Sequence, residues 1–312
     1  MQTNTISRFT SNNVLIRIVS YLLILSIGYF IISIPLNIFT SVLIKNDSLK
    51  YIGYTIEQLI PVAIIILGTG LTLRLLDKKS LKDIGFDMNS STMFNFAKGF
   101  SVGFLIIFLI FLVEVLFNWI HIEGFAWNFN ESSTLIKSYY FVILNLMSVA
   151  IVEEIFIRGY IMQNLEKSKG RLYAILVSSI VFGLLHTFSA YGTWAIYVVP
   201  LSHTLAGILL ALTYYIRENL WIPIGLHFSW NFFLYKFFGL TGMPKEYSIF
   251  IATEIKGPSF WVGLPNSSFG PEVGMLGIGM ITLAIIFIYR KWIVDKDNVG
   301  FESRKNSKRV PL

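Results

Sequence analysis

Long apolar stretches separated by short polar segments dominate the pattern along this chain. Each stretch holds about 20 residues, the length of helix that crosses ~30 Å of hydrocarbon at 1.5 Å per residue. Hydrophobic residues make up 54% of the chain and charged residues 14%, well outside the composition of soluble proteins. We therefore predict an all-α, polytopic membrane helix bundle of about eight transmembrane helices. The predicted helices are residues 18–44, 52–76, 94–120, 136–166, 171–189, 194–216, 221–238 and 273–292.

The basic residues predict the orientation of this bundle. If the N-terminus is cytoplasmic, 19 of the 25 Lys and Arg residues fall in the N-terminal segment, the tail and the loops on the same side. Loops that stay in the cytoplasm are enriched in Lys and Arg, so both termini are predicted to be cytoplasmic. This topology accounts for the net charge of +7 without a nucleic-acid partner. We expect an integral protein of the plasma membrane with the lipid bilayer as its surroundings.

Three parts of the chain follow from this pattern. Residues 1–93 hold the first two transmembrane helices and a cytoplasmic connection, residues 94–292 form the helix bundle that carries the candidate chemistry, and residues 293–312 are a polar cytoplasmic tail, predicted to be disordered. The chain has no cysteine. Disulfides, a thiolate nucleophile and a cysteine-based zinc site are therefore excluded.

Two adjacent carboxylates interrupt the fourth apolar segment. One carboxylate in the middle of a bilayer costs ~2.5 to 3.5 kcal/mol, so a pair there needs partners or a function. Glu154 and Arg158 lie one helical turn apart and are predicted to pair. Glu153 projects from another face of the helix, which leaves its carboxylate available for chemistry.

Three of the four histidines fall inside predicted membrane helices: His186, His203 and His227. His227 and Asn231 lie on one helical face, where an imidazole and a carboxamide can together bind an oxyanion. Glu153 is about 14 residues, and His186 about 15, from the turn that joins their helices, so an antiparallel pair of helices places them at matching depth. We predict a site that opens toward the cytoplasmic side.

The order and spacing of these motifs resemble a known family. The motifs Glu-Glu-x-x-x-Arg at 153–158, Phe-x-x-x-His at 182–186 and His-x-x-x-Asn at 227–231 resemble the CPBP family. It contains the CAAX prenyl endopeptidases of the Ras-converting type and the bacterial Abi, or bacteriocin-immunity, proteins. The resemblance is closest over residues 145–235, and the segment 270–274, Gly-Pro-Glu-Val-Gly, resembles bacterial members more loosely.

The resemblance implies an intramembrane endopeptidase acting on a membrane-tethered or hydrophobic peptide, with CAAX-type or prenylated proteins as the archetypal substrates. Glu153, assisted by His186, would activate water, and His227 with Asn231 would stabilise the oxyanion. As further members of the motifs, Glu154, Arg158 and Phe182 would have supporting roles.

His203 departs from the family pattern, which has an aromatic residue at this position. We interpret His203 as a core histidine, with an additional polar member of the site as the alternative.

Metal dependence stays open at this point. Glu153, His186 and His227 would make a two-histidine, one-carboxylate zinc site, but the sequence lacks the His-Glu-x-x-His signature, and we prefer a metal-free glutamate mechanism. Two other functions compete with the peptidase. One is a non-catalytic bacteriocin-immunity or membrane partner-binding protein, and the other is a transporter, which the lack of internal repeats disfavours.

Overall fold

The computed structural model describes residues 13–187, 194–241, 248–264 and 269–307, and most of these are helical. Arg8, Lys245, Lys308 and Arg309 of the charge count lie outside the described residues. The helices and helical turns are, in chain order, α1 (Val14–Gly28), η2 (Tyr29–Ser33), α2 (Ile34–Ile44), α3 (Lys50–Thr72), η3 (Leu73–Asp77), η4 (Leu81–Ile84), α4 (Thr92–Leu116), η5 (Ala126–Asn128), α5 (Ser132–Glu154), η6 (Ile155–Ile161), α6 (Met162–Lys169), α7 (Arg171–His186), α8 (Ala195–Arg217), α9 (Trp221–Asn231), η8 (Phe232–Phe237), α10 (Ser259–Val262), η10 (Pro271–Val273) and α11 (Met275–Ser307).

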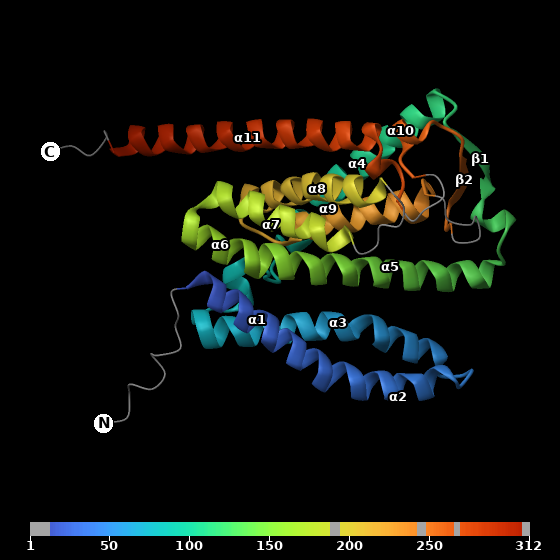
Figure 1. Ribbon diagram of the computed structural model, residues 1–312, viewed down its shortest axis with the longest axis horizontal. Coiled ribbons are helices and arrows are strands. Elements are labelled where there is room, and N and C mark those ends of the chain that lie inside the picture. Colours follow the sequence, from blue (N-terminus) through green and yellow to red (C-terminus); the bar gives the residue numbers. More distant parts are fainter. Residues whose placement is uncertain (1–12, 188–193, 242–247, 265–268, 308–312) are drawn as a thin grey trace.

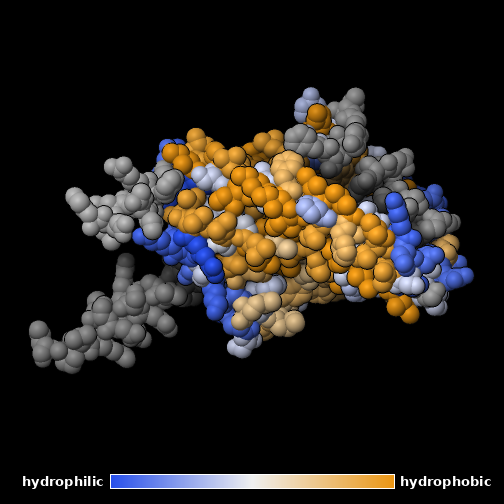
Figure 2. Space-filling view, turned by 90° about the horizontal axis from the view of Figure 1, so that it is seen from below, coloured by the Kyte–Doolittle hydropathy of each residue, from blue (hydrophilic) through white to orange (hydrophobic). Residues whose placement is uncertain are grey.

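Each of the eight predicted apolar segments contains a helix, but α4 ends at Leu116, before the predicted end at 120, and residues 188 and 189 of the fifth segment lie outside the described residues. Five helices in the described part of the chain are long and apolar enough to cross a membrane, and α7 is a shorter apolar helix. Figure 2 shows an apolar surface with polar residues toward both ends, as expected for an integral membrane protein. The five candidate spans are Val14–Ile44, Lys50–Asp77, Thr92–Leu116, Thr134–Lys169 and Ala195–Arg217.

The helices form two groups on either side of α5 (Figure 1). Helices α1, α2 and α3 pack against one another, and α3 contacts α5. On the other side lie α4, α7, α8 and α9, with α11 packed against α8. The helix α11 continues to Ser307, so the polar tail begins as helix where the sequence predicted disorder.

Glycines allow the closest helix contacts in the second group. A Cβ atom on Gly99 of α4 would lie 1.8 Å from the carbonyl oxygen of Ile222 on α9, and one on Gly225 of α9 would lie 2.2 Å from the carbonyl of Phe96. Between α7 and α8, a Cβ on Gly183 would lie 2.4 Å from the carbonyl of Pro200. Small residues let membrane helices approach this closely, which fixes α7 and α9 relative to their neighbours.

A short two-stranded antiparallel sheet lies beside the helices. Strand β1 (Ile120–Phe125), between α4 and α5, pairs with β2 (Ile251–Ile255), between η8 and α10. The register changes between Ile122 and Gly124, where Gly124 has φ of 151°. These strands are short and pair residues far apart along the chain, so no hairpin turn between them could have predicted the pairing from the sequence.

Candidate active site

The predicted pair of Glu154 and Arg158 forms a fully buried ion pair. Arg158 Nη1 lies 3.0 Å from Glu154 Oε1, and both side chains have no exposed area. The second nitrogen, Nη2, donates to the carbonyl oxygen of Gly207 on α8, at 3.2 Å. The ion pair therefore ties η6 to α8. Glu154 and Arg158 still lie one helical turn apart, although the helix becomes π-helical at Ile155, directly after the two carboxylates.

Glu154 also orients His227, a contact that the sequence did not predict. His227 Nδ1 lies 2.9 Å from Glu154 Oε1, and both groups are buried. A carboxylate oxygen only accepts hydrogen bonds, so His227 Nδ1 carries a proton. The second ring nitrogen, Nε2, lies on the other side of the ring. His227 Nε2 then lies 3.9 Å from Glu153 Oε2. The hydrogen bond to Glu154 therefore orients the His227 ring so that its Nε2 faces Glu153.

His186 approaches Glu153 from α7 in the same way. Its Nδ1 donates to the carbonyl oxygen of Phe182, at 2.8 Å, so in the neutral ring Nε2 carries no proton. His186 Nε2 lies 4.0 Å from Glu153 Oε2. The Phe182 ring supports this arrangement, because the Arg158 guanidinium lies 4.3 Å from its centre and the His186 ring 4.6 Å.

Glu153 is the carboxylate that faces open space. Its side chain is 32% exposed, whereas that of Glu154 is fully buried. The Oε2 atom of Glu153 is itself buried and has no hydrogen-bond partner among the described residues. Distances of 3.9 and 4.0 Å to two imidazole nitrogens are too long for direct hydrogen bonds and leave room for a shared water.

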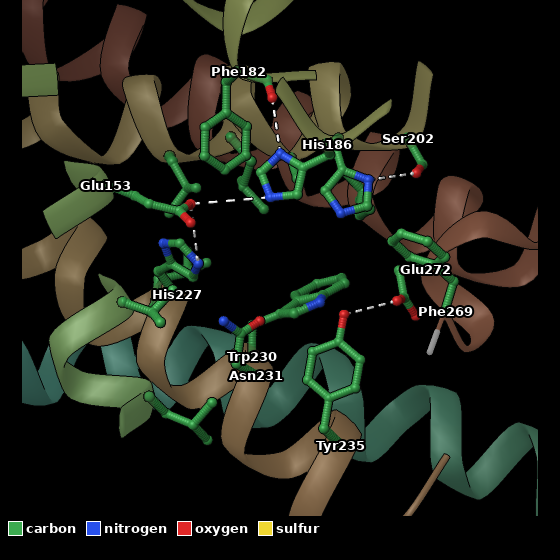
Figure 3. A pocket seen from close by; sticks show the side chains of 18 of the residues that line it. Glu153, Phe182, His186, Ser202, His227, Trp230, Asn231, Tyr235, Phe269 and Glu272 are labelled. Atoms are coloured by element: carbon green, nitrogen blue, oxygen red, sulfur yellow. Dashed lines mark hydrogen bonds and ion pairs between the residues drawn. The ribbon is translucent and has the colours of Figure 1, made fainter. Parts of the chain in front are cut away.

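A cavity of about 420 Å³ lies beside these groups. It is lined by Glu153, His186, His227 and Asn231, so all four predicted catalytic residues face one space (Figure 3). The Asn231 side chain makes no hydrogen bond to another described residue, which leaves its amide free to donate. Most of the remaining wall is apolar, including Leu146, Val149, Leu209, Leu210, Leu226, Trp230 and Ile281.

The cavity contains further polar residues that the predicted site did not include. His203, interpreted from the sequence as a core residue, lines the cavity and stacks on His186 with ring centres 4.2 Å apart. Its Nδ1 donates to the carbonyl of Val199, at 2.8 Å. Tyr235 and Glu272 line the cavity away from Glu153 (Figure 3). Tyr235 follows Asn231 by four residues on one helix, a spacing that could have revealed it.

The side chains do not fit the zinc site considered from the sequence. No group of three or more His, Cys, Asp or Glu side chains is arranged to hold a metal ion in the described part of the chain. Ligand atoms that bind one zinc ion at ~2.0 to 2.1 Å lie about 3.3 Å from one another. Glu153 Oε2 lies farther than this from Nε2 of His186 and of His227, at 4.0 and 3.9 Å. The chemistry below is therefore derived without a metal.

Residues 135–233 match the family model of the Rce1-like type II CAAX prenyl endopeptidases. Comparison with curated proteins and with solved structures gave no match. The family match confirms the resemblance predicted from the motifs, and it contains all four predicted catalytic residues. It indicates a membrane-embedded peptidase domain. Tyr235 and Glu272 lie outside the matched residues.

Proposed function

We propose, on the premise that residues 135–233 form a Rce1-like peptidase domain, that this protein hydrolyses a membrane-tethered or hydrophobic peptide by glutamate-activated water. The observation that carries the proposal is the convergence of Glu153 Oε2 with His186 Nε2 and His227 Nε2, at 4.0 and 3.9 Å, on the wall of one cavity. Charged groups this deep in an apolar bundle are expensive and mark functional sites.

In the first step, a water between Glu153 and His186 attacks the peptide carbonyl carbon. Both Glu153 Oε2 and the unprotonated His186 Nε2 accept hydrogen bonds, so together they hold both water protons and aim the oxygen lone pair at the carbonyl. Glu153 takes one proton as the new C–O bond forms. A general base must lie within hydrogen-bond reach of the proton it removes, a condition that this geometry supports.

In the second step, the tetrahedral intermediate collapses. Its oxyanion is bound by the Asn231 amide N–H and by the Nε2–H of His227 in its doubly protonated form, which keeps both ring protons throughout the reaction. The C–N bond then breaks, Glu153 gives the proton that it took from water to the leaving nitrogen, and the products are a carboxylic acid and an amine. Glu154 and Arg158 act indirectly, because they hold the His227 ring in the orientation that this step needs.

The substrate and its point of entry belong to the same proposal. The apolar wall suits an aliphatic or prenylated peptide, including a CAAX-type carboxyl terminus. The predicted orientation puts both termini and the turn between α6 and α7 in the cytoplasm, with the active site opening to that side and eight helices crossing the plasma membrane. Single cysteines introduced into this cysteine-free chain and labelled from one side with an impermeant maleimide would test the orientation.

Cleavage of a defined peptide tests the function itself. Purified protein in liposomes would be incubated with prenylated CAAX-type and unprenylated hydrophobic peptides, and the products identified by mass spectrometry. We expect cleavage of at least one class, and its loss in His186→Ala and His227→Ala variants that remain folded. No cleavage of either class, or undiminished cleavage by both variants, would refute the peptidase proposal.

A further inference from the structure

The end of the cavity away from Glu153 holds a second buried carboxyl group, that of Glu272. Only 3% of this residue is exposed, and it lines the cavity. The Tyr235 hydroxyl donates to Glu272 Oε1 at 3.0 Å, and the Gly270 backbone N–H donates to Oε2 at 2.9 Å. Figure 3 shows Tyr235 and Glu272 together, across the cavity from Glu153 and His227.

The backbone on both sides of Glu272 is closely packed against its neighbours. A Cβ atom on Gly270 would lie 2.1 Å from the carbonyl oxygen of Leu240, and one on Gly274 would lie 2.2 Å from that of Trp261. Gly263 has φ of 84°, and its Cβ would lie 2.0 Å from the carbonyl of Gly270. These glycines hold the turn η10 against its neighbours, so Glu272 is a preorganised part of the cavity wall.

No cation neutralises Glu272 within the described residues. No Lys, Arg or His nitrogen there lies within 4.0 Å of its carboxylate, although Lys236 also lines the cavity. Its hydrogen-bond donors, the Tyr235 hydroxyl and backbone N–H groups, are uncharged. An ionised carboxylate accepts about four hydrogen bonds, so some acceptor capacity is left. Burial raises the pKa of Glu272 to about 7, and a cation bound beside it would favour the ionised form.

We infer that Glu272, together with Tyr235, is a specificity subsite that binds a cationic side chain of the substrate. This inference rests on the proposed peptidase function and assigns part of its substrate preference. It also implies that a free carboxylate of the substrate does not occupy this end, because a second negative charge beside Glu272 would be repelled.

The spacing of His227 and Tyr235 along their helix gives the distance between the cleaved bond and the proposed subsite. Tyr235 follows His227 by eight residues along α9 and η8, which is about 12 Å at 1.5 Å per residue. An extended peptide covers ~3.3 to 3.6 Å per residue. The group that Glu272 binds therefore lies about three or four residues from the cleaved bond.

A positional scan of one hydrophobic peptide tests the subsite. Each position from two to five residues on either side of the cleaved bond would carry lysine, norleucine, glutamine or glutamate in turn. Norleucine keeps the four-carbon chain of lysine without its charge, and glutamine supplies a neutral donor. We expect a kcat/KM about tenfold higher with lysine than with norleucine at one position, three or four residues from the bond, and the poorest cleavage with glutamate there. Cleavage of the glutamine peptide as fast as the lysine peptide would contradict the binding of a cation.

The Glu272→Gln variant connects this preference to the subsite. It keeps the size of the side chain and an acceptor for the Gly270 N–H, and a thermal melt would verify its folding. The lysine-to-norleucine ratio should fall from about tenfold to below about threefold, while Tyr235→Phe, which keeps the carboxylate, should lower the ratio less. A ratio near one for the unsubstituted protein, or a ratio unchanged in Glu272→Gln, would overturn the inference.

A binding measurement separates this inference from the peptidase proposal. In the Glu153→Gln background, the Kd values of the lysine and norleucine peptides would be compared with and without Glu272→Gln, using intrinsic tryptophan fluorescence. Tighter binding of the lysine peptide that depends on Glu272 supports the subsite even if no peptide is cleaved. Equal binding of both peptides contradicts the subsite even if cleavage occurs.

Discussion

The two ends of the cavity hold their acidic groups in opposite ways. At one end, Glu154 is paired with Arg158 and hydrogen-bonded to His227, and Arg158 also donates to Gly207, so these contacts join three helices. At the other end, Glu272 is held by a backbone N–H and a tyrosine hydroxyl, with no cation within ion-pair distance among the described residues. The first arrangement neutralises a charge, and the second leaves a carboxyl that a ligand can still engage.

The two adjacent glutamates differ in a similar way, with a structural role for Glu154 and a chemical role for Glu153. Glu154 is fully buried, whereas Glu153 is 32% exposed and its Oε2 has no hydrogen-bond partner among the described residues. A buried charge that loses its partner is strongly destabilising, whereas a carboxylate beside open space is free to exchange protons with a substrate. The contrast therefore predicts different kinds of damage from removing each charge.

Glu154→Gln should have the largest effect on stability. It leaves the buried Arg158 without its counter-charge, which costs about 3 to 5 kcal/mol of unfolding free energy, and it releases the His227 ring. Denaturation in detergent would measure the loss, with Glu254→Gln in the exposed pair with Lys256 as the control. A loss below about 1 kcal/mol would contradict the role given to the buried network.

Asn231→Ala should have the next largest effect, on the rate alone. Loss of one oxyanion donor lowers kcat by about 10²- to 10³-fold, while KM changes little. The matched control is Asn145→Ala, because Asn145 donates to Gln58 between α3 and α5, outside the cavity lining. A decrease in kcat below about tenfold would remove Asn231 from the oxyanion site.

His203→Phe should have a smaller effect, because it tests the region between the two ends. Phenylalanine preserves a ring that can stack on His186 but removes the ring nitrogens. We expect kcat/KM to fall by less than about tenfold, the range of one neutral hydrogen bond. Single-turnover cleavage would measure it, with His203→Ala as the variant that also loses the stacked ring. A loss as large as that of His186→Ala would make His203 part of the chemistry.

Chelation should have the smallest effect. The atoms around Glu153 Oε2 are too widely spaced to share a zinc ion, so dialysis against a chelator should leave the cleavage rate unchanged. Elemental analysis of the purified protein would check for stoichiometric metal. Loss of activity on chelation, with recovery on adding zinc, would replace the glutamate mechanism with a metal-dependent one.

Much of the site could be predicted because its residues belong to helices with regular spacing. The one-turn pair of Glu154 with Arg158 and the shared face of His227 with Asn231 both follow from 100° per residue. Matching depth in two antiparallel helices brought Glu153 and His186 together, and the structure places them 4.0 Å apart.

The parts that escaped prediction depend on contacts between distant segments. The bond from His227 to Glu154 joins residues 73 positions apart, and its existence depends on how α5 and α9 rotate against each other. Strands β1 and β2 are likewise more than 120 residues apart. Glu272 lies in the segment 270–274, which the sequence related loosely to bacterial family members. Only the structure, in which glycines pack closely around η10, shows that Glu272 lines the cavity.

The central claim is that Glu153 is the base that activates water, and one variant tests it most directly. Cleavage of the best peptide substrate would be timed under single-turnover conditions for the unsubstituted protein and for Glu153→Gln, with thermal melts of both in the same detergent. We predict a rate decrease of about 10³-fold or more with little change in melting temperature, because Glu153 is 32% exposed and its 3.9 and 4.0 Å contacts with the two imidazoles are too long for direct hydrogen bonds. Cleavage by folded Glu153→Gln within about tenfold of the unsubstituted rate would contradict the claim.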